Sequence, residues 1–273
     1  MEKFTPMEKS AFFKTKVSSN YFKVRNEISL KTEESDFKAS STYEIVMKKT
    51  PDEDYDLFVD RLKFKVNGKE IENKFSKVSD EYFKCIFPIK LLLNEGNFEL
   101  ANYEEIKNRI IEKDKQLQDE MEGDGLKYIR DQFFEKTNSY EKLSEFIFSL
   151  GIIKTLESAM QRYSFEKKSK FDWTSPIVGK TVWQLKNADE AKVSGEYIYQ
   201  NSHQSELLNY FNQYRIENNL EEINEEVLIK CALKQQINYA NETLFFTESK
   251  TDISIEIGSF LDYQETLFLK SVM

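Results

Sequence analysis

Residues 253–269, ISIEIGSFLDYQETLFL, consist of two runs with alternating apolar residues on either side of Gly258-Ser259. The apolar positions that keep period two are Ile253, Ile255, Ile257, Tyr263, Leu267 and Leu269. Such alternation is typical of half-buried strands, and short polar breaks join antiparallel neighbours. Apolar residues at 233–239 and 244–246 extend the pattern upstream, with further polar breaks at Asn241 and near Lys250. The sequence therefore predicts a C-terminal antiparallel β-meander.

The first hundred residues repeat this period. The predicted inward-facing residues are Phe22, Val24, Ile28 and Leu30; Tyr43, Ile45 and Met47; and Phe58, Leu62, Phe64 and Val66. Asn67-Gly68 follows the third run, and this dipeptide favours a type I′ hairpin turn, in which both residues have positive φ. We expect Ile71 and Phe75 to continue the return strand. We also expect a short apolar strand over 82–87.

Between these regions the apolar residues recur at helical spacing. We predict one helix that begins after Asn102, with Glu105 completing its cap, and a second that follows the break at Gly123-Asp124-Gly125. A third helix begins after Asn138, and its apolar face runs from Leu143 to Met160. From Phe171 the period returns to two, apart from a helix that Ser205 caps.

Helices and strands are segregated along the chain, which is typical of an α+β fold. We expect an N-terminal antiparallel sheet (1–100), a central three-helix segment (101–170) and an α+β region that ends in the meander (171–273). Two arrangements are expected for the two strand regions: one sheet on the helices in a single domain, or two lobes divided near residue 170. Both arrangements fit the composition.

Composition limits the classes of partner. The formal net charge is −9, from 39 basic and 48 acidic residues. This charge disfavours nucleic acid and anionic membranes, since both bind through Lys and Arg. The strongest candidate for a nucleic-acid-binding stripe of basic and aromatic residues is 162–173. Its aromatic residues fit equally well as anchors that hold a helix-to-strand crossover on the core. No signal peptide or membrane span is expected from the apolar runs, so we predict a soluble, cytoplasmic protein.

The chain has one histidine, His203, two cysteines and eight glycines. A histidine-rich metal site, a Ser-His-Asp triad and a glycine-rich phosphate loop are therefore not expected, and we predict no catalytic, cofactor or metal residues. Cys85 and Cys231 lie in apolar patterns and suit buried, reduced thiols, although a disulfide between them stays open. The acidic stretch 52–56 lacks the spacing of a calcium loop and is expected to be a solvated connection, and the acidic cluster at 221–226 is expected to be the solvent face of a helix or its entry.

These features favour a non-enzymatic protein that acts through a protein–protein interface. One version is an acidic inhibitor of the immunity or antitoxin kind that covers a basic partner, because acidic surfaces steer such encounters. We place its contacts at Asp52, Glu53, Asp54, Tyr55 and Asp56. Two alternatives remain: a binder of a small apolar ligand between sheet and helices, for which the 22 Phe and 14 Tyr argue, and a carboxylate-dependent hydrolase.

Overall fold

The computed structural model describes residues 19–50, 54–94, 97–120, 123–160, 170–175, 177–185, 194–199, 204–223, 226–239 and 246–272. The strands are β1 (Ser19–Thr32), β2 (Asp36–Lys49), β3 (Leu57–Val66), β4 (Ile89–Asn94), β5 (Asn97–Leu100), β6 (Lys170–Ser175), β7 (Gly179–Leu185), β8 (Ser194–Tyr199), β9 (Ile229–Tyr239), β10 (Phe246–Ile257) and β11 (Leu261–Ser271). The helices are α2 (Lys74–Lys84), α3 (Tyr103–Glu120), α4 (Asp124–Thr137), α5 (Tyr140–Ser149), α6 (Gly151–Met160) and α7 (Gln204–Glu217).

The strands form one 11-stranded antiparallel sheet in the order β5-β4-β3-β2-β1-β11-β10-β9-β8-β7-β6. The N-terminal strands and the C-terminal meander meet at its centre, where β1 pairs with β11 and Val24 lies opposite Leu269. The α+β class, the N-terminal antiparallel strands, the central helical segment and the C-terminal meander are confirmed. The two strand regions are parts of the same sheet.

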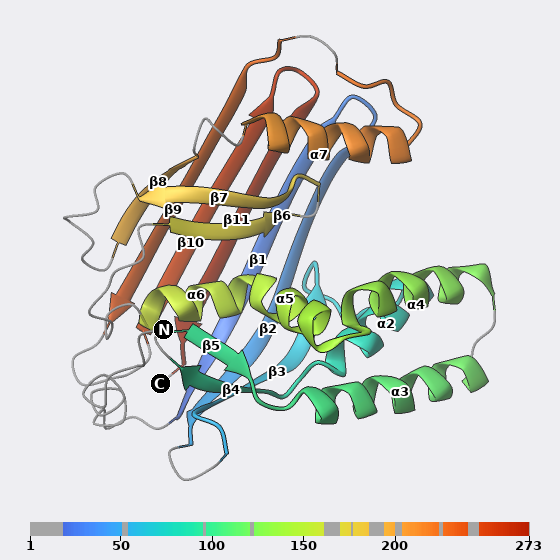
Figure 1. Cartoon of the computed structure of the whole chain (residues 1–273), viewed down its shortest axis with the longest axis vertical. Coiled ribbons are helices and arrows are strands. Elements are labelled where there is room, and N and C mark those ends of the chain that lie inside the picture. The colour runs from blue at the N-terminus through green and yellow to red at the C-terminus, as the bar shows by residue number, and fades with distance from the viewer. Residues whose placement is uncertain are drawn as a thin grey trace.

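One face of the long strands carries the core. Its buried side chains alternate along the strands and include Phe22, Val24, Ile45, Met47, Ile255, Leu267 and Leu269. In Figure 1 the long strands β1, β2 and β9–β11 lie behind, while both ends of the sheet and the helices lie in front of them. The period-two pattern therefore directs the apolar residues toward the helices and leaves the outer face polar.

Helix α6 packs directly on this face. Seven of its residues are buried, namely Ile152, Ile153, Lys154, Thr155, Leu156, Ala159 and Met160. At its start, a Cβ atom on Gly151 would lie 2.8 Å from Leu267 of β11 and 2.9 Å from Trp173 of β6. At its end, the Tyr239 hydroxyl of β9 donates to the carbonyl of Ala159 at 2.9 Å. The glycine therefore allows the helix to approach the sheet this closely.

The expected return strand after Asn67-Gly68 is wrong, although the turn is confirmed. Asn67 and Gly68 have φ values of 49° and 75°, as a type I′ turn requires. Beyond it only a single bridge, from Val66 to Lys69, continues the pairing. Residues 74–84 form α2 instead, and this helix includes Phe75 of the expected return strand and Tyr82 of the strand expected over 82–87. The helix begins here because the Asn73 side chain accepts hydrogen bonds from the backbone N–H groups of residues 75 and 76. The helix then buries Val78 and Tyr82, which lie four residues apart on one face.

The predicted third helix is two helices, so the segment 101–170 holds four described helices rather than three. Leu150 has an extended backbone, with φ −64° and ψ 128°, and this break lets α6 turn onto the sheet. The cap of α5 is Ser139, whose hydroxyl accepts from the Lys142 N–H at 3.2 Å, and not Asn138. Helix α3 begins after Asn102 as expected, but the Asn102 amide binds the backbone of Lys90 and Pro88.

The predicted break near Lys250 is also wrong. Strand β10 continues through Lys250, which pairs with Gln236 of β9 and Phe268 of β11. The lysine is exposed on the polar face of the sheet, so its charge does not interrupt the strand. The break expected at Asn241 lies outside the described residues. Helix α7 begins at Gln204, one residue before the expected cap at Ser205.

Candidate functional site: a cavity between the sheet and the helices

A cavity of about 510 Å³ lies between the inner face of the sheet, the helices α2 and α6, and Leu150, which connects α5 to α6. Its wall on the sheet side is formed mainly by Asn26, Ser41, Tyr43, Arg61, Glu265 and Leu267. Its wall on the helix side is formed mainly by Phe75, Ser79, Phe83, Leu150 and Ile152. Phe75 is half exposed, so the cavity reaches the surface beside α2.

A β-bulge in β3 allows both Arg61 and Phe64, which lie on either side of it, to face this cavity. Pairing between β2 and β3 shifts between Thr42 and Glu44, and Lys63 in the shifted segment has a positive φ of 54°. Before the shift, Arg61 faces inward and Leu62 is exposed; after it, Phe64 faces inward. The expected inward positions of Phe58 and Leu62 are therefore wrong, because the extra residue reverses the alternation of the strand. The two neighbours of Phe58, Leu57 and Val59, are the buried residues instead.

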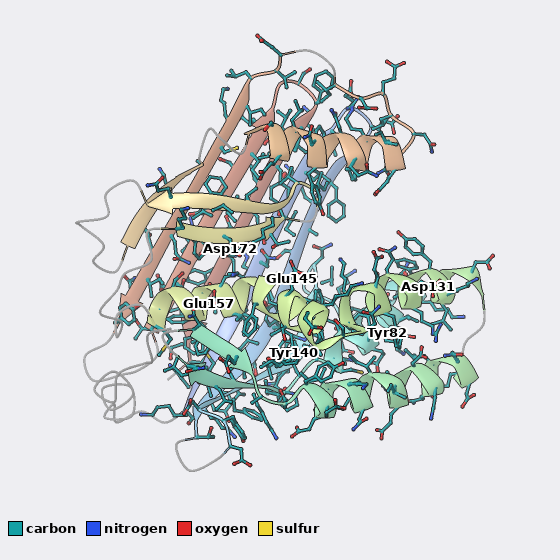
Figure 2. The ribbon with its side chains drawn as sticks, in the orientation of Figure 1. Tyr82, Asp131, Tyr140, Glu145, Glu157 and Asp172 are labelled. Carbon is teal, nitrogen blue, oxygen red and sulfur yellow. The ribbon has the colours of Figure 1, made fainter. Side chains whose placement is uncertain are left out.

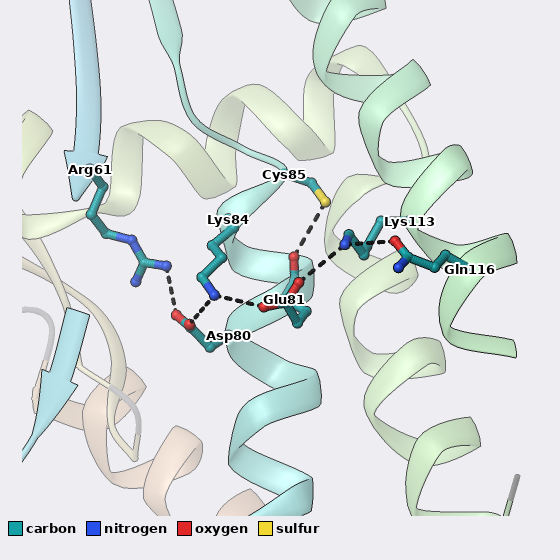
Figure 3. A network of polar contacts seen from close by, with 7 residues as sticks. All are labelled: Arg61, Asp80, Glu81, Lys84, Cys85, Lys113 and Gln116. Atoms are coloured by element: carbon teal, nitrogen blue, oxygen red, sulfur yellow. Dashed lines mark hydrogen bonds and ion pairs between the residues drawn. The ribbon is translucent and has the colours of Figure 1, made fainter. Parts of the chain in front are cut away.

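Arg61 ties β3 to helix α2. Its guanidinium donates to the Asp80 carboxylate at 2.7 Å, and the two side chains are only 4% and 11% exposed. The contacts continue along α2, because Lys84 pairs with Asp80 at 3.1 Å and with Glu81 at 2.6 Å. Glu81 then pairs with Lys113 of α3 at 3.1 Å, as Figure 3 shows. This chain of contacts fixes one wall of the cavity.

Three aromatic rings surround the Arg61 guanidinium. Its centre lies 4.6 Å from the ring centroid of Phe64, 4.7 Å from that of Phe83 and 5.6 Å from that of Phe87. A cation over the face of an aromatic ring is stabilised by the ring quadrupole. The rings and the Asp80 carboxylate therefore satisfy the charge of Arg61 within the protein.

Glu265 is a second charged group of the cavity wall, and it is 8% exposed. Its Oε2 accepts from Trp173 Nε1 at 2.9 Å and from the Tyr263 hydroxyl at 2.8 Å. Its Oε1 accepts from Asn26 Nδ2 at 3.2 Å. Burial raises the pKa of the Glu265 carboxyl, and these three donors only partly oppose the effect. Among the described residues, Glu265 makes no ion pair.

The pKa direction gives a testable dependence of stability on pH. Since the pKa of Glu265 is higher in the folded protein, ionisation costs more in the folded state than in the unfolded one. That cost is absent below the unfolded pKa and appears as the pH rises through it. We expect Glu265→Gln to raise the melting temperature relative to the unmodified protein more at about pH 8 than at about pH 4.

Glu256→Gln on β10 is the matched control, because the Glu256 side chain is 46% exposed. Its difference from the unmodified protein should change little over the same pH range. Thermal unfolding followed by tryptophan fluorescence checks both variants. A Glu265→Gln difference that is independent of pH would contradict the burial argument.

The acidic segment proposed as a contact surface has two different parts. Asp54 is exposed, and the ring of Tyr55 lies 5.1 Å from Lys90 Nζ. Asp56 is 5% exposed, and its carboxylate accepts from the backbone N–H of Leu93 at 2.8 Å. Asp56 therefore anchors β4 and does not present its carboxylate at the surface. Asp52 and Glu53 lie outside the described residues.

The other sequence candidates are placed as follows. His203 lies outside the described residues, as do 162–169 of the basic stripe. Trp173 is 2% exposed and its indole binds Glu265, so it belongs to the core. Nearby, Lys154 pairs with Asp172 at 2.9 Å and with Glu157 at 3.2 Å (Figure 2).

Both cysteines are free thiols, so the disulfide left open by the sequence is not formed. Burial raises the pKa of Cys85 to about 11 and that of Cys231 to about 12. Such thiols are poor nucleophiles near neutral pH. Among the described residues, no group of three or more His, Cys, Asp or Glu side chains could hold a metal ion. In the same part of the chain, no helix has the length and hydropathy needed to cross a membrane.

Comparisons with known proteins identify no family. No family model matches the chain, and no curated protein matches it. Among solved structures, a chain described under lipid–protein interactions in lipovitellin has a TM-score of 0.42 and 5% sequence identity. The match covers 94% of this chain and 25% of the lipovitellin chain. This chain thus spans about a quarter of that length, and a similarity at this TM-score carries no inference about function.

Proposed function

We propose that this protein binds a small, largely apolar molecule in the cavity between the sheet and the helices α2 and α6. The cavity itself is the observation that supports the proposal. Its volume of about 510 Å³ lies within the range of small-molecule sites, which is about 300–1,000 Å³. Phenylalanine and aliphatic residues make up half of its lining residues, and several polar groups, including Glu265, converge on it.

The size of the hydrophobic effect makes such binding measurable. Burial of one CH₂ group contributes about 0.8 kcal/mol, so a chain of about ten such groups contributes roughly 8 kcal/mol. Loss of translational and rotational freedom costs at least about 4 kcal/mol of this gain. The remaining gain of at most about 4 kcal/mol corresponds to a dissociation constant of about 1 mM or weaker for a chain with no polar contact.

Filling the cavity is the test of this function. Ser79 lies on α2 and lines the cavity, so Ser79→Trp should occupy the space that the ligand needs. We expect the variant to bind the neutral fluorescent probe N-phenyl-1-naphthylamine at least about tenfold more weakly than the unmodified protein, because at least 1.4 kcal/mol of burial is lost.

Lys77→Trp is the matched control, because Lys77 is an exposed residue of the same helix and does not line the cavity. It should bind the probe within about twofold of the unmodified protein. The proposal would be contradicted if the unmodified protein did not bind the probe, or if the two variants lost probe affinity to the same extent.

The protein-interface function that the net charge predicts stays a prediction, as does the carboxylate-dependent hydrolase. The burial of Asp56 removes one carboxylate from the surface proposed for the interface. For the hydrolase, the Asp80 carboxylate of the cavity wall is held by Arg61 and Lys84. Neither feature favours these functions over ligand binding.

A further inference from the structure

The formal charges of the cavity wall do not balance. Three of the lining side chains carry a formal charge: Arg61, Asp80 and Glu265. Arg61 and Asp80 pair with each other at 2.7 Å, and three aromatic rings cover the guanidinium. Glu265 is therefore the carboxylate of this wall that has no cationic partner among the described residues.

The Glu265 carboxylate can also accept a further hydrogen bond. Two donors, Trp173 and Tyr263, occupy Oε2, while one donor, Asn26, binds Oε1. An ionised carboxylate offers about four acceptor sites, so Oε1 can accept one more hydrogen bond. Asn26 and Glu265 both line the cavity, and a bound molecule can therefore supply that donor.

We propose that the ligand is a cationic amphiphile, with a protonated amine that pairs with Glu265 and an apolar chain that lies against Phe83, Leu150 and Ile152. This inference rests on the proposed function and specifies the chemical class of its ligand. A buried charge is costly unless it is paired, and an ammonium group would provide the missing partner. The protein's net charge of −9 also favours the approach of a cation.

Other head groups satisfy the site less well. A fatty acid would bring a second carboxylate beside Glu265, and like charges at short distance in a site of low dielectric repel strongly. An aliphatic alcohol can donate a hydrogen bond to Oε1, but it leaves the charge unpaired. Arg61 cannot attract an anionic head group as a free cation would, because Asp80 already neutralises it.

Three probes with the same twelve-carbon chain test the head group: dodecylammonium, 1-dodecanol and dodecanoate. Their affinities for the unmodified protein are measured near neutral pH by displacement of N-phenyl-1-naphthylamine, below the critical micelle concentrations of the two ionic probes and below the solubility limit of dodecanol. We expect dodecylammonium to bind at least about tenfold more tightly than dodecanol, and dodecanoate to bind most weakly. An affinity of dodecanol or dodecanoate that equals or exceeds that of dodecylammonium would overturn the inference.

Glu265→Gln then assigns the preference to this residue. The glutamine has nearly the same shape but no charge, so dodecylammonium should lose at least about tenfold in affinity while dodecanol stays within about threefold. Glu256→Gln, on the exposed face of β10, should retain the affinities of the unmodified protein. An equal loss for both probes in Glu265→Gln contradicts a charge-specific contact.

The two proposals fail in different ways. If the three probes bind without discrimination, the cavity still binds apolar molecules and only the cationic class is wrong. If none of them binds and N-phenyl-1-naphthylamine does not bind either, both proposals are overturned. Should Glu265→Gln fail to fold, the order of the three probes on the unmodified protein still decides the inference.

Discussion

Arg61→Met is expected to lower the free energy of unfolding by about 3 kcal/mol. The substitution leaves the nearly buried Asp80 carboxylate with Lys84 as its remaining ion-pair partner, and the Lys84 side chain is 54% exposed. It also removes the cation from the faces of Phe64 and Phe83. Urea denaturation followed by tryptophan fluorescence measures the loss, and hydrogen exchange should show α2 opening more readily.

Lys65→Met is the control for this prediction, because Lys65 is an exposed residue of the same strand. It should change the free energy of unfolding by less than about 0.5 kcal/mol. The double variant Arg61→Met/Asp80→Leu should recover about half of the loss, since an apolar pair can replace a buried ion pair. A loss below about 1 kcal/mol for Arg61→Met would show that the pair does not hold α2 on the sheet.

Asp114→Ala is expected to lower the free energy of unfolding by about 2–3 kcal/mol, because it removes the acceptor of hydrogen bonds that join three helices. The Asp114 carboxylate of α3 is buried and accepts from the Tyr82 hydroxyl of α2 at 2.7 Å. It also accepts from Arg130 Nε of α4 at 2.8 Å. Tyr82 is fully buried, so its hydroxyl would lose its partner in a site that water reaches poorly. Thermal and urea denaturation measure the loss.

Asp119→Ala on the same helix is the matched control, because Asp119 is exposed. Tyr82→Phe completes a double-mutant cycle, in which we expect a coupling energy of at least about 1 kcal/mol between Tyr82 and Asp114. Additive losses in the double variant would mean that the hydrogen bond makes no net contribution to stability.

The strands could be predicted from the sequence because their alternation is regular. Phe22 and Val24, like Ile45 and Met47, are buried as the period-two pattern requires. The pattern failed in β3, where the bulge at Lys63 reverses the inward face, so that Arg61 before it and Phe64 after it both line the cavity. A bulge at a non-glycine residue leaves little trace in a single sequence, and Lys63 shows no turn signature.

The cavity residues Asn26 and Glu265 were missed although a signal was present. Asn26 stands between Val24 and Ile28 in the inward phase of β1, and Glu265 stands between Tyr263 and Leu267 in that of β11. A polar residue at an inward position of a strand must find a hydrogen-bonding partner, which makes such positions candidates for a site. The strands were predicted from their apolar members alone, so these two positions were not considered.

Helix α2 was missed for a physical reason of a different kind. The Asn67-Gly68 turn is local and forms as expected, but the turn does not determine how far the return strand extends. Asn73 supplies two cap hydrogen bonds six residues after Asn67, and these favour a helix over continued pairing. The packing of Val78 and Tyr82 on α3 and α4 then stabilises the helix, and this contact is distant in sequence.

The pairing of β1 with β11 has a consequence for synthesis on the ribosome. Phe22 lies opposite Ser271, so the two strands that form the middle of the sheet are translated almost a whole chain apart. A nascent chain therefore carries β1 with one unpaired edge until β11 emerges, and such edges are prone to pair with other chains. Protection of that edge, by a chaperone or by rapid completion, would determine the yield of folded protein in the cell.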